Sequence, residues 1–264
     1  MRLLATLALC AFATAALAQT TTPVTVTKDA QAVAVLTQMA AATGWSPSNL
    51  PSDAVLSGTL TRYEPTQASL SLTMKTTGPS QVRTEVNDGA KLVTTIVNSG
   101  IAATVTASST VALPAPAAMA LRPTHLPLFL GLSAALGDPG ISVAYQGMEI
   151  VNGQQTYRVR ISRPYAAGDP MGKLLSRASW LAVWVSQGGA LPVQISYELI
   201  GTDNPNARFV HTAQFSDFRS IGGLLVPFHE EVYLGTRHLY SLQISSVQFN
   251  VGVPATDFAI PAVQ

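Results

Sequence analysis

Charged side chains and cysteine are scarce in this sequence of 264 residues. Asp, Glu, Lys and Arg make up 11% of the chain, and 15 basic against 14 acidic residues give a net charge of +1. Phosphate-backbone binding needs a concentrated positive surface, so we expect no nucleic-acid partner. The one cysteine, Cys10, lies near the N-terminus. The rest of the chain therefore has no disulfide, thiolate metal site or thiol nucleophile.

The N-terminus has the pattern of a leader. Arg2 precedes an apolar run over Leu3–Leu17, and residues 16–18 read Ala-Leu-Ala, a small-x-small cleavage pattern. The run is shorter than the roughly 20 residues that span a bilayer. We predict a signal peptide at residues 1–18, cleavage after Ala18 and export to the periplasm. Residues 7–10 partly match a lipoprotein signal, although Leu9 is bulky for it, and acylation of Cys10 stays an open alternative.

The exported part reads as one domain. Residues 19–27 are Thr-rich and are predicted to be a flexible terminus, and residues 28–264 form a single unit with no internal repeat or linker. Apolar residues at three- and four-residue spacing predict a helix over Lys28–Thr43, with Thr27 as its N-cap and Gly44 at its end.

After that helix the apolar period changes from 3.6 to 2, which is typical of half-buried strands. Short turn signals such as Asp88-Gly89 and Asn152-Gly153 separate the strands and favour antiparallel hairpins. We predict a mainly β fold of about ten or eleven antiparallel strands. Examples are Ala54–Tyr63, Gln81–Asn87, Leu92–Asn98, Gln154–Ser162, Val193–Leu199 and Arg237–Phe249.

Two segments interrupt the strand pattern. Leu113–Pro127 is rich in Pro and Ala, and the apolar stretch Leu128–Leu136 that follows predicts a short helical flap. Pro164–Ser179 reads as a loop with a short helix around Leu174.

Motifs for catalysis and metal binding are weak. Gly131–Ala135 nearly matches the G-x-S-x-G nucleophile elbow, but Ala replaces the second Gly and no strand precedes it. The histidines lack paired metal-ligand spacing, and the acidic residues are scattered over many strands. We therefore expect no catalytic residue, metal or cofactor, while a carboxylate pair stays an alternative. The side chains in question are His125, His211, His229, His238, Glu85, Glu149, Glu198, Asp217 and Glu231.

The apolar sides of the predicted strands should share one face of a curved sheet. One helix of about 16 residues is roughly 24 Å long, too short to cover that face. Either the sheet closes on itself or it leaves an apolar cavity suited to a lipid-like ligand. The residues predicted to line it are Leu70, Leu72, Met74, Val82, Val86, Val159, Ile161, Val193, Ile195 and Tyr197.

An ordered series of motifs along most of the exported chain resembles the LolA/LolB/RseB superfamily of outer-membrane lipoprotein-sorting and carrier-like proteins. The motifs are Ala42–Trp45, Gly58–Leu60, Gly78–Arg83, Asn98–Gly100, Tyr145–Gly147, Leu191–Ile195, Phe215–Arg219, Gly222–Pro227 and Val247–Asn250.

The resemblance implies a half-open antiparallel β-barrel whose apolar concavity is covered by an N-terminal helix and a helical flap. Carriers of this kind shield lipoprotein acyl chains, and RseB-like members sense them; none has catalytic residues. The implied partners are an acyl chain or other lipid and a membrane-associated donor or acceptor protein. An arginine that holds the lid closed in carriers has its nearest match in Arg83, then Arg62. The insert over Leu113–Leu136 departs from a minimal carrier, which leaves an RseB-like sensor or protein-interaction module as the alternative.

Overall fold

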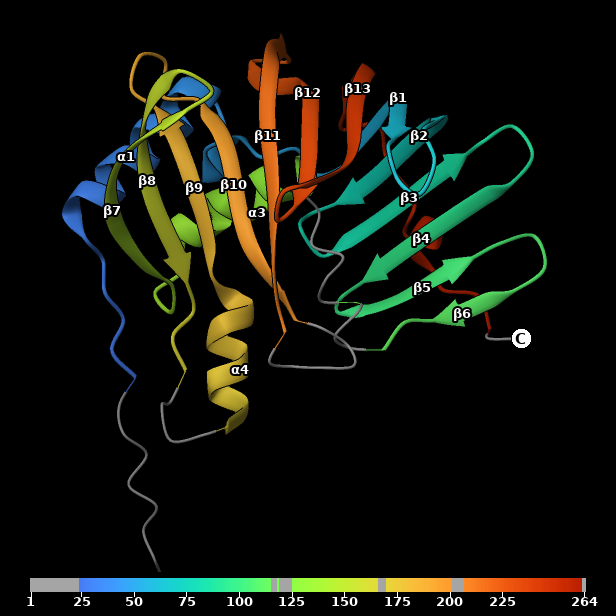
Figure 1. Ribbon diagram of the computed structural model, residues 1–264, viewed down its shortest axis with the longest axis horizontal. Coiled ribbons are helices and arrows are strands. Elements are labelled where there is room, and N and C mark those ends of the chain that lie inside the picture. Colours follow the sequence, from blue (N-terminus) through green and yellow to red (C-terminus); the bar gives the residue numbers. More distant parts are fainter. Residues whose placement is uncertain (1–23, 115–117, 119–124, 166–169, 201–206, 263–264) are drawn as a thin grey trace, which may run out of the picture.

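The computed structural model describes residues 24–114, 118, 125–165, 170–200 and 207–262. Within these ranges the chain forms one antiparallel sheet of 13 strands, in the order β6-β5-β4-β3-β2-β1-β13-β12-β11-β10-β9-β8-β7. The sheet curves from β7 to β6 without closing (Figure 1). The predicted mainly β, half-open antiparallel barrel is therefore confirmed, with more strands than expected.

The strands fall into two meanders. The first comprises β1 (Ala54–Arg62), β2 (Ala68–Thr77), β3 (Gln81–Asn87), β4 (Leu92–Asn98), β5 (Ile101–Val105) and β6 (Thr110–Ala112). The second comprises β7 (Ser142–Val151), β8 (Gln154–Ser162), β9 (Leu181–Ser186), β10 (Pro192–Ile200), β11 (Arg208–Ile221), β12 (Leu224–Leu234) and β13 (Arg237–Phe249). The sequence did not predict β6, because three residues are too few to show an alternation.

One long-range pairing joins the meanders. β1 pairs with β13 from Ala54 opposite Phe249 to Arg62 opposite Tyr240. All other strand pairs are neighbours in the sequence. Hairpin turns therefore set most of the register, and the β1–β13 seam unites the two halves.

Helix α1 (Ala30–Thr43) starts two residues later than predicted. Asp29, not Thr27, is the N-cap, and its Oδ1 accepts the Ala32 N–H at 2.9 Å. Thr27 instead bonds to Val143, where Lys28 makes a short parallel bridge. The helix ends at Gly44 as predicted, with φ 77°, and a Cβ there would lie 2.4 Å from a backbone carbonyl oxygen.

Four short elements complete the described chain. The predicted flap is helix α3 (Leu126–Gly137), and the predicted helix around Leu174 is α4 (Pro170–Ser179). Two 3₁₀ turns, η1 (Pro47–Asn49) and η2 (Ala255–Phe258), follow α1 and β13. The predicted signal peptide at 1–18 and residues 19–23 of the predicted flexible terminus lie outside the described residues.

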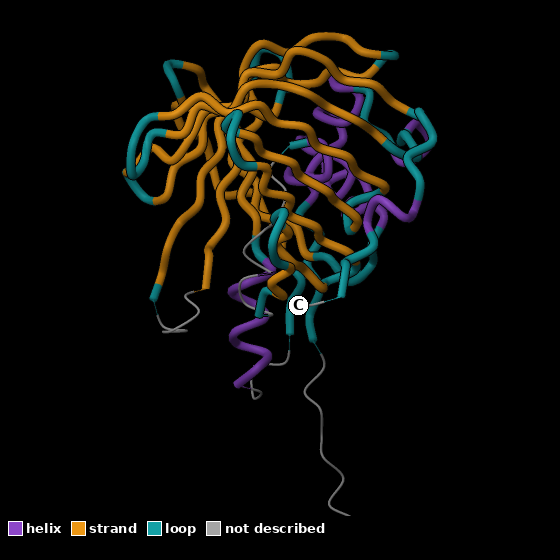
Figure 2. The backbone as a smooth tube through the Cα atoms, turned by 90° about the vertical axis from the view of Figure 1, so that its right-hand side faces the viewer, coloured by secondary structure: helices purple, strands orange, loops and turns teal. Residues whose placement is uncertain are grey.

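Helices lie against one face of the sheet, which we call the inner face (Figure 2). The hydrophobic core lies between that face and helices α1 and α3. One cluster joins α1 to strands β7–β12 through residues such as Leu36, Val159 and Ile195. A second cluster joins α3 to the seam strands, with Phe129 stacked on Trp45 at 5.6 Å between ring centroids. The two helices therefore cover apolar side chains that alternation along the strands places on the inner face.

Candidate functional site

The predicted lining residues of the first meander do share the inner face. Leu72 lies opposite Val86, and Thr76 lies opposite Val82, so these positions are in phase. Leu72 packs in the same cluster as α3. Leu70 and Met74 follow by the two-residue alternation of β2. The register thus brings Leu70, Leu72, Met74, Val82 and Val86 together on one surface.

In the second meander, four predicted lining residues lie in closed core. Val159 and Ile195 are 0% exposed, and Ile161 and Tyr197 are also buried. All four belong to the cluster that contains Val35, Leu36 and Met39 of α1. A ligand could reach them only if α1 moved off the sheet. Their apolar character is explained by packing against the helix.

The prediction that Val193 lines the inner face is wrong. Pro192 and Gln194 pair with successive residues of β9, so Val193 is an extra residue in a β-bulge. A bulge shifts the side-chain alternation by one position. Val193 accordingly packs against Ala182 and Trp184, on the opposite face, which we call the outer face.

Arg83 is also on the outer face, so its predicted role as a lid contact is wrong. It alternates with the inner residue Val82, and one residue along a strand reverses the side chain. Its Nε donates to Glu85 Oε1 at 2.6 Å, and its Nη1 donates to the Asp257 carbonyl at 3.2 Å. Arg83 thus holds the C-terminal turn η2. Arg62 is exposed at the end of β1, and its side chain has no hydrogen bond or ion pair with the other described residues.

The inner face of β2–β4 differs from the closed core. Val86 faces Val93, and Val82 faces Val97, which extends the apolar surface by two residues that the sequence analysis missed. We call Leu70, Met74, Val82, Val86, Val93 and Val97 the inner patch, of which Leu70 and Val82 are buried, at 6% and 5% exposed. Val86, Val93 and Val97 are half-buried. Among the described helices, α1 packs on β7–β9 and β12, and α3 belongs to the cluster that contains Leu72 and against which Met74 and Val86 pack.

Two buried histidines lie on the covered side. His125, directly before α3, is 0% exposed, and its Nε2 is 2.9 Å from the Pro227 carbonyl oxygen. His211 stacks on Tyr197 with ring centroids 4.7 Å apart. Burial lowers the pKa of each to about 4. Both are therefore neutral near pH 7, and His125 Nε2–H can donate to Pro227 and anchor α3 to β12.

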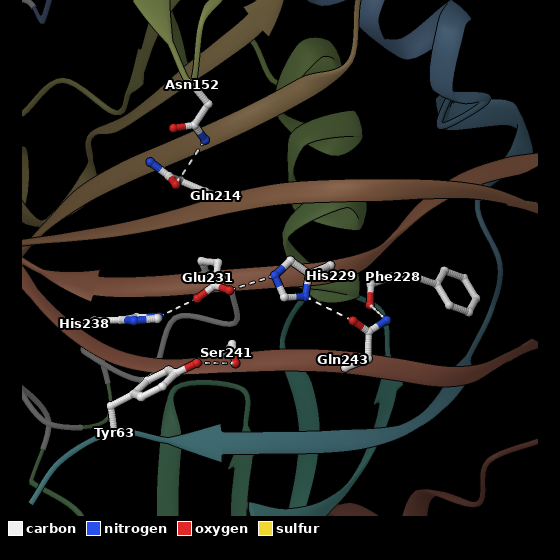
Figure 3. A network of polar contacts seen from close by, with 9 residues as sticks. All are labelled: Tyr63, Asn152, Gln214, Phe228, His229, Glu231, His238, Ser241 and Gln243. Atoms are coloured by element: carbon white, nitrogen blue, oxygen red, sulfur yellow. Dashed lines mark hydrogen bonds and ion pairs between the residues drawn. The ribbon is translucent and has the colours of Figure 1, made fainter. Parts of the chain in front are cut away.

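The other two histidines belong to a polar network on the outer face (Figure 3). His229 Nε2 lies 2.7 Å from Glu231 Oε1, and His238 Nε2 is paired with the second oxygen of the same carboxylate. The Tyr63 ring stacks on His238 at 4.1 Å. Within the described ranges no three His, Cys, Asp or Glu side chains are placed to hold a metal ion.

The two catalytic alternatives were a nucleophile elbow at Gly131–Ala135 and a pair of carboxylates, and the geometry of the described residues favours neither. Gly131–Ala135 lies within α3, whereas a nucleophile elbow needs a sharp turn from strand to helix. The candidate carboxylates come from five different strands, and each is paired with a basic side chain. The pairs are Glu85 with Arg83, Glu149 with Arg158, Glu198 with Arg177, Asp217 with Arg219, and Glu231 with His229.

No helix in the described ranges is both long enough and apolar enough to cross a membrane.

The chain matches no protein-family model and no curated protein by sequence. Its fold is similar to that of a DUF1329 family protein from Desulfovibrio piger, with TM-score 0.56, 13% identity and coverage of 89% of this chain and 98% of that one.

A LolA superfamily protein from Nitrosomonas europaea gives TM-score 0.53 and 11% identity, over 86% of this chain and 97% of that one. A domain named for outer membrane lipoprotein sorting, from Vibrio parahaemolyticus, gives TM-score 0.55 and 10% identity, over 86% and 96%. Identities this low establish shape and connectivity only. These matches and the half-open sheet with its helical cover show that the chain shares the fold of these structures, among them the LolA superfamily protein.

Proposed function

We propose that this protein is an exported, non-enzymatic lipid-binding protein that shields an acyl chain on the inner patch. The observation that carries the proposal is the half-buried row formed by Val86, Val93 and Val97, beside a closed core on the same face. Transfer of an acyl chain from water to such a surface contributes about 0.8 kcal/mol per CH₂ group. No polar chemistry is needed for affinity.

Helix α3 is the element that would admit the ligand. It lies between the closed core and the inner patch, and Phe129 and Leu130 pack in the seam cluster. Its anchor at the N-terminal end is the contact between His125 and Pro227. Movement of α3 about that anchor would uncover Leu72 and enlarge the apolar surface. The lipid would come from a lipoprotein or membrane donor and pass to a membrane-associated acceptor, with export directed by residues 1–18.

The direct test is mass spectrometry of organic extracts from the protein, expressed with its leader in a bacterial periplasm and purified without detergent. We expect lipid or an acylated peptide in stoichiometric amount. An empty protein that also fails to bind added fatty acid would contradict the proposal, because the inner patch would then be ordinary packed surface.

A matched pair of variants locates the ligand. Val86→Glu places a carboxylate on the inner patch, and Ser71→Glu places the same charge on the exposed outer side of the neighbouring strand β2. We expect Val86→Glu to abolish binding of a fluorescent fatty acid and Ser71→Glu to leave it unchanged. Circular dichroism and thermal unfolding check that both variants fold. Equal binding by the two folded variants would rule out the inner patch as the site.

The alternative is an RseB-like sensor or protein-interaction module. One observation favours it: in the described residues, the second part of the outer edge of β7 pairs with no other strand, and its exposed apolar residues suit a polypeptide partner.

A further inference from the structure

Strand β7 is one end of the sheet, so one of its two edges faces no other strand of the sheet. Unpaired backbone N–H and C=O groups on an edge strand can pair with another chain. Natural edges are blunted by short length, Lys, Pro or bulges. The other edge, β6, has three residues, whereas β7 has ten.

The first part of the β7 edge is already occupied by the chain itself. Val143 N–H donates to the Thr27 carbonyl at 2.8 Å, and the Val143 carbonyl accepts the Asp29 N–H at 3.0 Å. Because this bridge is parallel, residues before Thr27 run toward Ser142, away from the end of β7. A bulge between Tyr145 and Gly147 then interrupts the strand.

The second part of the edge is open in the described residues. A two-residue turn, Asn152-Gly153, joins β7 to β8, so the flanking residues Val151 and Gln154 form the closing hydrogen-bonded pair. Hydrogen-bonded and non-hydrogen-bonded pairs alternate along an antiparallel ladder. Ile150 and Met148 are therefore in non-hydrogen-bonded pairs with β8, and their backbone N–H and C=O groups point to the outer edge. Their side chains are also the most exposed large apolar groups of the strand, at 67% and 73%.

Glu149, between these two residues, faces the other way. Its carboxylate accepts hydrogen bonds from Arg158 at 2.8 Å and from the Trp184 indole at 2.7 Å. In the register that would use both Met148 and Ile150 of two copies, each Glu149 would lie opposite the other Glu149. Like charges directly opposite are unfavourable in an antiparallel pair. The edge is therefore better suited to a different chain than to its own copy.

We propose that the segment Met148–Ile150 binds an extended segment of another polypeptide as an added strand. The partner carries apolar residues at alternate positions, opposite Met148 and Ile150, and a neutral or basic residue opposite Glu149. Backbone hydrogen bonds supply affinity, and the two exposed side chains supply selectivity for apolar neighbours. This site is separate from the inner patch and does not depend on lipid binding.

The test uses the capped heptapeptide Ser-Thr-Val-Lys-Val-Thr-Ser, added to the full exported protein labelled with nitrogen-15. We expect chemical-shift changes and slower hydrogen exchange at the Met148 and Ile150 amides. The matched control is the same peptide with both valine nitrogens methylated, which removes the required donors and should abolish the changes.

Two protein variants decide where the peptide pairs. Ile150→Lys should weaken binding by at least about tenfold, while Val111→Lys, on the other edge strand, should not change it. Val111 is 55% exposed, so both substitutions are at exposed sites and should fold. No shift at millimolar peptide, equal binding of the methylated peptide, or loss of binding only in Val111→Lys would overturn the proposal.

Self-association of the wild-type protein that Ile150→Lys removes would also overturn it, in favour of a second copy. Val86→Glu should leave peptide binding intact, which separates a failure here from a failure of the lipid proposal.

Discussion

The two halves of the inner face have the same strand pattern but different surroundings. In the β7–β10 half, Val159 and Ile195 are 0% exposed because α1 fills the space above them. In the β2–β4 half, Val86 and Val93 are half-buried. Alternation therefore decides which face of a strand is apolar, and the position of one helix decides whether that face is closed core or half-buried surface.

Lowering the pH should have the largest effect on stability. Both buried histidines lie on the covered side, so the loss should come from the half of the inner face that the helices cover. His125 and His211 have pKa values lowered to about 4, against 6.5 when unfolded. As pH falls from about 6.5 to about 4, the unfolded chain takes up protons that the folded chain excludes. Each histidine then contributes up to roughly 3 kcal/mol less stability, and little further loss through these groups occurs below pH 4.

Urea unfolding at a series of pH values measures this loss. The double variant His125→Gln, His211→Phe should show a much flatter profile between about pH 6.5 and pH 4.5. Below that range Asp88, Asp138, Glu149 and Asp217, whose pKa values are lowered by their hydrogen bonds, add a further loss in both proteins. An equally steep profile in the variant would place the acid sensitivity elsewhere.

Shortening an apolar side chain in each half of the inner face should have the next largest effect on the free energy of unfolding. Leu36→Ala in α1 should cost about 3 kcal/mol, because the side chain is 1% exposed and leaves a cavity. Val86→Ala should cost about 1 kcal/mol, because its side chain is only half-buried. Denaturant unfolding of both variants in lipid-free protein compares them. Similar costs would break the distinction, since they would show that the inner patch is packed like the core.

The C-terminal turn η2 contacts the outer face of the first meander. Removing one of its ion pairs should have the smallest effect on stability. Lys75 Nζ lies 2.9 Å from Asp257 Oδ2, and both side chains are partly exposed. Asp257→Asn should therefore cost less than about 1 kcal/mol, with less difference from wild type at high salt. Thermal unfolding in low and high salt checks this. A loss of several kcal/mol would indicate that η2 controls the packing of the first meander.

The sequence predicted most of the fold because its signals are local. Gln81–Asn87, Leu92–Asn98, Gln154–Ser162 and Arg237–Phe249 match the observed strands end for end, since Gly and Asn turns bound alternating runs. The errors occur where one residue changes the phase. At Val193 a bulge reversed the side chain.

The site was harder to predict than the fold. Arg83 could have been placed correctly from the sequence, because it is adjacent to Val82 in the same strand and must face the other way. The division of the apolar face into core and patch could not have been predicted from the sequence, because it depends on α1 packing against strands far along the chain. The open edge at Met148 depends likewise on which strand ends the sheet.

The position of α1 also constrains the order in which the protein can fold. The helix precedes every strand in the sequence, yet it packs on β7–β9 and β12. Thr27 meets a residue 115 positions later, and the Trp45 indole donates to a carbonyl 180 positions later. During synthesis from the N-terminus, the apolar side of α1 has no docking surface until most of the chain has emerged. Folding should therefore be slow, and the newly made helix is the segment for which chaperone protection matters most.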